Sequence, residues 1–179
     1  SLNQINNCMF AYCQSIAEIT IPSSITQIGK NAFLNCVSLL QVFIPSSVTL
    51  IDEKAFAYCS RLKKINIPSS VTEIKKHTFN SCSSLDQIII PSSITEIGEH
   101  AFFGCFLKEL TIPSSVTKIG SGSFANCMFL ENVIFETPSS LREIGDDAFL
   151  NCNLGSKLKI PSTVVSIGNN QSYTGCMIC

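Results

Sequence analysis

Ten cysteines and two histidines are the residues of this 179-residue chain that could bind a metal ion or carry out thiol chemistry. His77 and His100 are 23 residues apart, and Cys82 and Cys105 each follow one of them by five residues. Two imidazoles and two thiolates can together bind Zn²⁺. We expect the histidines to face solvent on the outer rim of the fold and the thiols to face its interior, so that one ion cannot reach all four. The sequence therefore predicts no metal site.

Motifs that mark common catalytic sites are absent from the sequence. It contains no G-x-S-x-G elbow, no phosphate-binding glycine loop and no H-E-x-x-H motif. Catalysis by a cysteine–histidine pair needs an exposed thiolate, which a buried column of thiols does not supply. We predict a protein that is not an enzyme and that uses no cofactor.

The composition excludes several classes of protein. The 12 basic and 13 acidic residues give a net charge of -1, which argues against a nucleic-acid-binding protein because phosphate binding requires a basic surface. Only 14% of residues are charged and 45% are hydrophobic, so the chain is not disordered. No apolar run approaches the roughly 18 residues of a membrane helix.

Short repeats of about 23 residues extend along the whole sequence. Seven prolines mark the period: Pro22, Pro45, Pro68, Pro91, Pro113, Pro138 and Pro161. Eight cysteines keep the same period, each three residues after an aromatic residue: Cys13, Cys36, Cys59, Cys82, Cys105, Cys127, Cys152 and Cys176. A fixed short period predicts a solenoid, in which each coil buries its apolar side chains against its neighbours. Residues 1–179 would form one solenoid of seven to eight coils, with partial coils at 1–13 and 162–179 and an insertion near 136–137.

Each repeat predicts the parts of one coil. In residues 85–90 alternate side chains face inward as in a strand, and Pro91 ends that strand because it lacks an N–H. Residues 94–98 form a second short extended piece, and residues 101–105 close the coil through a single helical turn. Stacked coils would place equivalent strands about 4.8 Å apart in a parallel sheet. The predicted fold is a right-handed curved rod with a parallel sheet on one face, mostly strand and loop with little helix.

The repeat L-x-x-I-x-I-P-S-S-V-T-x-I-G-x-x-A-F-x-x-C resembles the BspA-like, or Treponema-type, leucine-rich repeats of bacterial and protist surface proteins. Asp52 and Lys75 replace the corner glycine of this repeat, and residues 136–137 are an insertion, so we expect irregular sixth and seventh coils. The resemblance implies a leucine-rich-repeat solenoid, secreted or at the cell surface, that binds host or matrix proteins or other microbes.

A column of buried aromatic rings and thiols is expected inside the rod. Identical positions of stacked coils point the same way, so the thiols would pack as small apolar groups and not as disulfides. The predicted core ladder comprises Phe33, Phe56, Phe79, Phe102, Phe124, Phe149, Cys36, Cys59, Cys82, Cys105, Cys127 and Cys152. Cys8 and Cys179 fall outside this column and are the expected reactive thiols.

The outward positions of the sheet face are the candidate binding surface for a protein ligand. Large apolar residues occupy three of these positions, Phe43, Ile89 and Ile134, and Leu40 with Phe43 forms the strongest candidate hot spot. Polar residues of the neighbouring column, Lys64, Gln87 and Glu109, would surround them. The alternative is that such residues simply favour strands and that single exposed ones need no partner.

The two ends of the chain suggest further interactions. Ser1 begins midway through a repeat, so we expect either a longer natural chain or self-association through uncapped ends. Residues 176–179 fit a C-a-a-X prenylation signal at Cys176, although Cys176 is also the eighth ladder cysteine and the match is read as coincidence. Residues 170–172 form an N-glycosylation sequon, which has meaning only in a secreted protein. An intracellular scaffold that docks partner proteins therefore stays open beside the surface adhesin, and a membrane would be a partner only through lipidation or a longer anchored chain.

Overall fold

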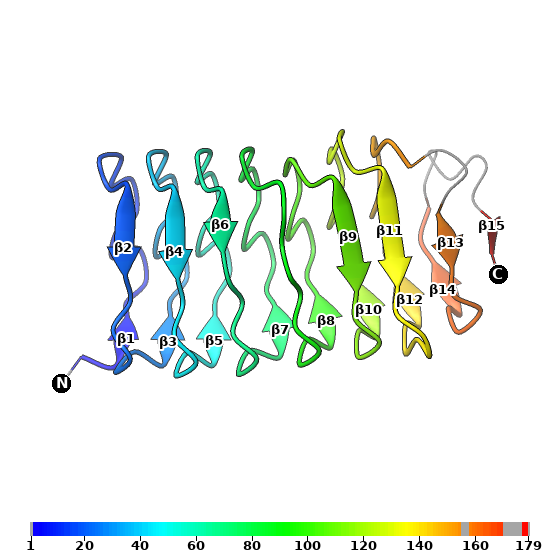
Figure 1. The fold of residues 1–179 in the computed structure, drawn as a ribbon, viewed down its shortest axis with the longest axis horizontal. Coiled ribbons are helices and arrows are strands. Elements are labelled where there is room, and N and C mark those ends of the chain that lie inside the picture. Colours follow the sequence, from blue (N-terminus) through cyan, green and yellow to red (C-terminus); the bar gives the residue numbers. More distant parts are fainter. Residues whose placement is uncertain (1, 155–157, 170–176, 179) are drawn as a thin grey trace.

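A computed structural model describes residues 2–154, 158–169 and 177–178 of the chain as a solenoid of about seven coils. The coils follow one another along the long axis, and the strands β1 (Gln4–Ile5) and β15 (Met177–Ile178) lie at opposite ends of the rod (Figure 1). The described residues include short parallel strands, turns and no helix. This confirms the parallel-strand solenoid that the repeats predict.

The strands form two rows along the rod. The face row contains strands of two to four residues: β2 (Glu18–Thr20), β4 (Gln41–Phe43), β6 (Lys64–Ile65), β9 (Glu109–Ile112), β11 (Asn132–Phe135), β13 (Lys159–Ile160) and β15 (Met177–Ile178). The second row contains two-residue strands: β1 (Gln4–Ile5), β3 (Gln27–Ile28), β5 (Leu50–Ile51), β7 (Glu73–Ile74), β8 (Glu96–Ile97), β10 (Lys118–Ile119), β12 (Glu143–Ile144) and β14 (Ser166–Ile167). All paired strands are parallel, with Thr20 opposite Phe43 and Ile28 opposite Ile51.

Residue alternation in the face row follows the predicted pattern. Val42 and Ile44 are buried in the core, and Phe43 between them faces solvent. Pro45 follows, and the second serine of the next turn donates a hydrogen bond across the coils, from Ser47 Oγ to the carbonyl oxygen of Ile25 at 2.7 Å. The repeated P-S-S sequence therefore ends one strand and ties its coil to the preceding one.

The segment that closes each coil is a run of tight turns, so the expected helical turn is wrong. Ala32 N–H donates to the carbonyl of Gly29 and Leu34 N–H to that of Asn31, whereas Phe33 N–H donates to Ala55 of the next coil. Two residues of each such segment have positive φ, which interrupts any right-handed helix. Two columns result: Cys8, Asn31, Lys54, His77, His100, Gly122 and Asp147 form the first, and Tyr12, Asn35, Tyr58, Ser81, Gly104, Asn126 and Asn151 form the second.

Stacked phenylalanines and free thiols fill the core beside these turns. The ring centroids of Phe33 and Phe56 are 5.2 Å apart with planes 3° from parallel, and the other rings of the predicted ladder stack in the same way. The Cys82 thiol donates to the carbonyl oxygen of Phe56 at 3.2 Å. Ladder cysteines 36 to 127 are fully buried, Cys152 is half-buried, and all of them are free. The thiols therefore join successive coils by hydrogen bonds, in addition to packing as apolar groups.

Glycine at the coil corner allows successive coils to approach closely. A Cβ added at Gly98 would lie 2.7 Å from the backbone nitrogen of Lys76. At six corners the amide donates to an isoleucine of the preceding coil, for example Gly98 to Ile74 at 2.7 Å and Asp52 to Ile28 at 2.9 Å. The amide of Lys75 makes no such bond, and β5 does not pair with β7.

The face row is interrupted at residues 87–90. Their backbone groups make no hydrogen bond within the described chain, and the face row divides into β2–β4–β6, β9–β11 and β13–β15. The coil containing this segment follows the irregular corner at Lys75, and it has one residue fewer between its cysteine, Cys105, and the next leucine, Leu107. Both departures from the repeat therefore adjoin the interrupted segment.

The insertion near 136–137 has a smaller effect than expected. The amide of Glu136 still donates to Ile112 at 3.0 Å, and β11 pairs with β9 along its whole length. The ladder does end between β11 and β13. The sequence therefore located one irregularity, in the sixth and seventh coils, and missed the other, at residues 75–90.

Candidate functional site

Three large apolar side chains of the face row point into solvent as predicted. Phe43 in β4 is 69% exposed, Ile89 in the unpaired segment is 84% exposed and Ile134 in β11 is 50% exposed. Their inward-facing neighbours, such as Val42 and Ile90, are buried in the core. The backbone alternation that buries one set therefore forces the other set outward.

Two open grooves run along the face row on either side of residues 86–89. The first has a volume of about 870 Å³ and includes Phe43 and Ile89 in its lining, and its polar residues are Glu18, Thr20, Gln41, Lys63, Lys64, Asn66, Asp86 and Gln87. The second has a volume of about 1090 Å³ and includes Ile89, Thr111 and Phe129, with Asp86, Gln87, Lys108, Glu109, Glu131, Asn132 and Glu136 as its polar residues. Both grooves therefore combine exposed apolar side chains with charged groups of both signs.

The predicted site residues do not all meet. Lys64 and Gln87 line the first groove, and Gln87 and Glu109 line the second. Leu40 is half-buried and does not belong to the lining of either groove, so the hot spot of Leu40 with Phe43 stays a prediction. Ile134 is exposed beyond the second groove.

Sequence reasoning missed an aromatic pair at the edge of the second groove. The rings of Phe106 and Phe129 stack with centroids 3.8 Å apart, and both side chains are exposed, as is Met128 beside them. The sequence contained a signal for this pair. Between the cysteine and the following leucine, the second to fourth repeats hold Val37, Arg61 and serines, whereas the fifth and sixth repeats hold Phe106 and Phe129.

The two histidines, which we expected to face solvent on the outer rim, lie against each other and are half-buried. The ring centroids are 5.1 Å apart and the ring planes are 11° from parallel. Glu99 lies beside them, with its Oε1 3.3 Å from Nδ1 of His100. One nitrogen of each ring and a carboxylate oxygen lie within 4.8 Å of one another. Cys82 and Cys105 are buried in the core, so the structure replaces the considered two-histidine, two-cysteine set with a set that includes Glu99.

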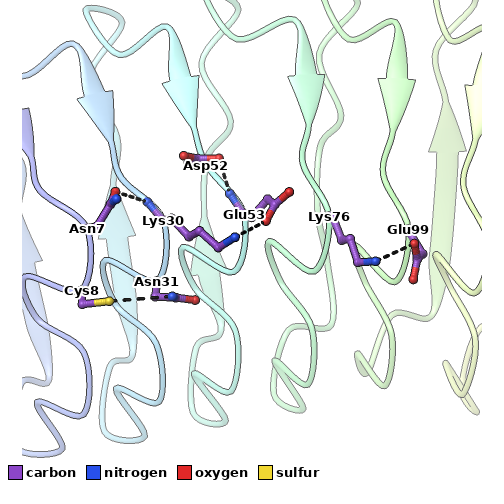
Figure 2. A network of polar contacts seen from close by, with 8 residues as sticks. All are labelled: Asn7, Cys8, Lys30, Asn31, Asp52, Glu53, Lys76 and Glu99. Carbon is purple, nitrogen blue, oxygen red and sulfur yellow. Dashed lines mark hydrogen bonds and ion pairs between the residues drawn. The ribbon is translucent and has the colours of Figure 1, made fainter.

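Charged residues of one column pair along the same edge of the rod (Figure 2). Lys30 Nζ lies 2.7 Å from Glu53 Oε2, and Lys76 Nζ lies 2.7 Å from Glu99 Oε2. The hydrogen bond from Lys76 holds the pKa of the Glu99 carboxyl below its usual value. Burial, followed by the neighbouring charge of His100, lowers the pKa of His77. Basic and acidic residues alternate along this column, and exposed ion pairs of this kind stabilise the fold only slightly.

The ladder thiols are poor nucleophiles. Burial raises the pKa of Cys36 to about 11 and that of Cys59 to about 12. A thiol must ionise to attack a substrate, so these cysteines remain in their neutral form at pH 7. Cys8 is exposed, and the amide of Asn31 donates to its sulfur at 3.7 Å (Figure 2).

The terminal motifs lie outside the described residues. Cys176, Cys179 and the sequon at 170–172 belong to this part of the chain, so the lipidation and glycosylation readings stay predictions. Among the described residues, no helix has the length and apolar character that crossing a membrane requires.

Comparison with known proteins shows the same repeat. The model of the BspA type leucine-rich repeat region, in six copies, matches residues 1–106 and 51–178. The chain resembles a Treponema pallidum leucine-rich repeat protein, with 29% identity and a TM-score of 0.75 over 96% of this chain and 79% of that one. None of the curated protein sequences matches it.

Two further solved structures are similar. A leucine-rich repeat protein of Bacteroides ovatus is 30% identical with a TM-score of 0.70, and the match covers 90% of this chain and 50% of that one. A leucine-rich cell surface protein of Faecalibacterium prausnitzii is 26% identical with a TM-score of 0.60, covering 94% and 61%. The chain therefore spans about half the length of the Bacteroides ovatus protein.

Proposed function

Because the chain belongs to the BspA-type leucine-rich repeat family, we propose that it is a non-enzymatic protein-binding module that acts in adhesion at the cell surface. The observation that carries this proposal is the face row, where Phe43 and Ile89 stand exposed in a groove of about 870 Å³. An array of outward side chains, one from each coil, is the usual binding surface of a solenoid.

The chemistry of the face row favours a protein ligand. Interfaces between proteins combine a small apolar centre with a polar rim. Here Ile89 borders both grooves, while Lys64 and Asp86 supply charges of opposite sign at the rim. Such a surface matches a partner that presents apolar side chains together with both acidic and basic groups.

A location at the cell surface is supported by one of the similar proteins. The Faecalibacterium prausnitzii protein is a leucine-rich cell surface protein, and its coils superimpose on this chain with a TM-score of 0.60. The proposal for this chain extends that location by family membership.

Binding to immobilised matrix proteins tests the adhesive function. The purified chain should bind at least one of fibronectin, laminin and collagen saturably in biolayer interferometry, and antibody should stain intact cells that express the natural protein. Absence of binding to all three, together with staining only after permeabilisation, would contradict the proposal.

An intracellular scaffold is the second candidate function, and the free thiols favour it. All eight cysteines in the described part of the chain are unpaired, whereas secreted proteins commonly use disulfides. Such a scaffold would dock partner proteins on the same face row or self-associate through its ends. Staining restricted to permeabilised cells would support this candidate.

A further inference from the structure

The turn edge of the rod brings three metal-ligating side chains together. His77 follows β7, and Glu99 and His100 follow β8 one coil later. One ligand atom from each lies within 4.8 Å of the other two, and all three side chains are half-buried. We propose that His77, Glu99 and His100 bind a divalent transition-metal ion, with Zn²⁺ as the best match.

The two rings are stacked 5.1 Å apart and 11° from parallel, and their neighbours determine which nitrogen of each ring is free to bind the ion. A nitrogen of the Asn80 amide lies 3.1 Å from Nδ1 of His77; turning the amide would present its oxygen to Nδ1–H and leave Nε2 for the ion. Gly122 lies against Nε2 of His100, and a Cβ there would be only 2.6 Å away. Nδ1 of His100, which faces Glu99, is therefore its ligand atom.

Glu99 has one oxygen for each of its two neighbours. Its Oε2 is 2.7 Å from Lys76 Nζ, as Figure 2 shows, and its Oε1 faces Nδ1 of His100 at 3.3 Å. The ion would bind Oε1. Lys76 competes for the same carboxylate and, with Lys54, adds positive charge near His77, so both lysines weaken binding of a cation.

The donor set matches the chemistry of zinc. Imidazole nitrogens and a carboxylate oxygen are Zn²⁺ ligands with bonds of about 2.0–2.2 Å, and three protein ligands leave a fourth position for water. Tetrahedral bonds of this length place ligand atoms about 3.4 Å apart. Side-chain rotation must therefore close the present separations of up to 4.8 Å.

An ion at this point would join two coils. Glu99 and His100 belong to the coil that contains residues 87–90, where the face row lacks hydrogen bonds, and His77 belongs to the preceding coil. A ligand that binds only the folded chain raises its stability. The metal would therefore reinforce the coils where backbone pairing is interrupted.

Titration of the tag-free, EDTA-treated chain with Zn²⁺ tests the site, with Co²⁺ absorption as a second readout. His77→Asn is the main variant, because Asn31 already occupies the equivalent positive-φ position of another coil. His77→Asn, Glu99→Gln and His100→Asn should each weaken Zn²⁺ binding at this site by at least about tenfold. Glu53→Gln is the matched control, since Glu53 also pairs with a lysine, Lys30, but has no histidine beside it, and it should leave binding unchanged.

Lys76→Met gives a test that no unfolding can imitate. Removal of the competing ammonium should tighten Zn²⁺ binding about two- to fivefold, corresponding to one exposed ion pair. Melting in EDTA shows whether His77→Asn is folded like the wild type. If it is, and if both proteins bind Zn²⁺ with the same stoichiometry and give the same Co²⁺ spectrum, the proposal is overturned. Binding that Lys76→Met fails to tighten would overturn the assignment of Glu99 as a ligand.

Discussion

A Cβ at Gly98 would lie 2.7 Å from the backbone nitrogen of Lys76 in the preceding coil. The corner glycine therefore sets how closely two coils can approach. Among the described corners, Asp52 and Lys75 are the only successive pair in which neither residue is glycine. At this pair the corner hydrogen bond is missing, because the coils cannot close.

Substitution of a corner glycine should destabilise the fold. Gly98→Ala places a methyl group against the backbone of Lys75 and Lys76, and overpacking of this kind costs about 1–3 kcal/mol. Urea unfolding followed by circular dichroism measures the change. Ser92→Ala, an exposed site on the same coil, should change the free energy of unfolding by less than about 0.5 kcal/mol. Equal stability of the two variants would contradict the role of the corner.

The reverse substitution should restore the missing contact. Lys75→Gly allows the amide of residue 75 to reach the carbonyl of Ile51, as Gly98 reaches Ile74 at 2.7 Å. One added hydrogen bond corresponds to slowing of amide exchange by roughly two- to tenfold. Hydrogen exchange measured by NMR at residue 75 tests this expectation. Lys75→Ala keeps the Cβ and should exchange as the wild type does; slowing in both variants would contradict a steric cause.

Residues with positive φ should prefer glycine. Lys54 is exposed and has φ of 56°, a conformation that costs a residue with a Cβ about 1–2 kcal/mol. Lys54→Gly should therefore be more stable than Lys54→Ala by about 1 kcal/mol in chemical unfolding, after the entropic cost of glycine is included. At Lys64 in strand β6 the order should reverse. The same order at both positions would contradict the left-handed assignment.

Ionisation of the core thiols should destabilise the fold at alkaline pH. Burial raises the pKa of Cys59 from about 9 to about 12, so the folded chain retains a proton that the unfolded chain releases. The contribution of this thiol to stability is complete below pH 9 and is lost as the pH rises toward 12. Urea unfolding at pH 8, 9 and 10 should show a smaller decline for Cys59→Ala than for the wild type. Cys8→Ser should keep the wild-type decline, and an equal decline in all three would contradict the prediction.

Much of the fold could be predicted because one repeat position meets the same position of the next coil. The stacking of Phe33 on Phe56 and the burial of Cys82 follow directly from the 23-residue period. Local backbone geometry did not follow, since the repeat letters do not distinguish one helical turn from consecutive turns with positive φ at Asn31 and Asn35.

Contacts between different repeat positions were the part that could not be predicted. Glu99 meets His77 diagonally, from the next coil and a neighbouring column, and a comparison of identical positions does not find such a pair. Residues 87–90 match the repeat motif, yet they lack ladder bonds, and the departures from the repeat adjoin them, at Lys75 and between Cys105 and Leu107.

Binding by variants of the face row tests the central claim most directly. The test variant, Phe43→Ser with Ile89→Ser, removes both exposed apolar side chains of the first groove. The control variant, Tyr12→Asn with Tyr58→Asn, removes two exposed aromatic residues of the turn edge, at positions where other coils have asparagine. Affinity for the matrix protein that the wild type binds is measured by biolayer interferometry. It should fall at least about tenfold in the first variant, because truncation of a hot-spot residue costs about 2 kcal/mol or more of binding free energy. It should be unchanged in the second variant. Melting should stay within about 2 °C of the wild type in both, because these side chains are exposed. Full binding by the face-row variant, or loss of binding only in the turn-edge variant, would contradict the account.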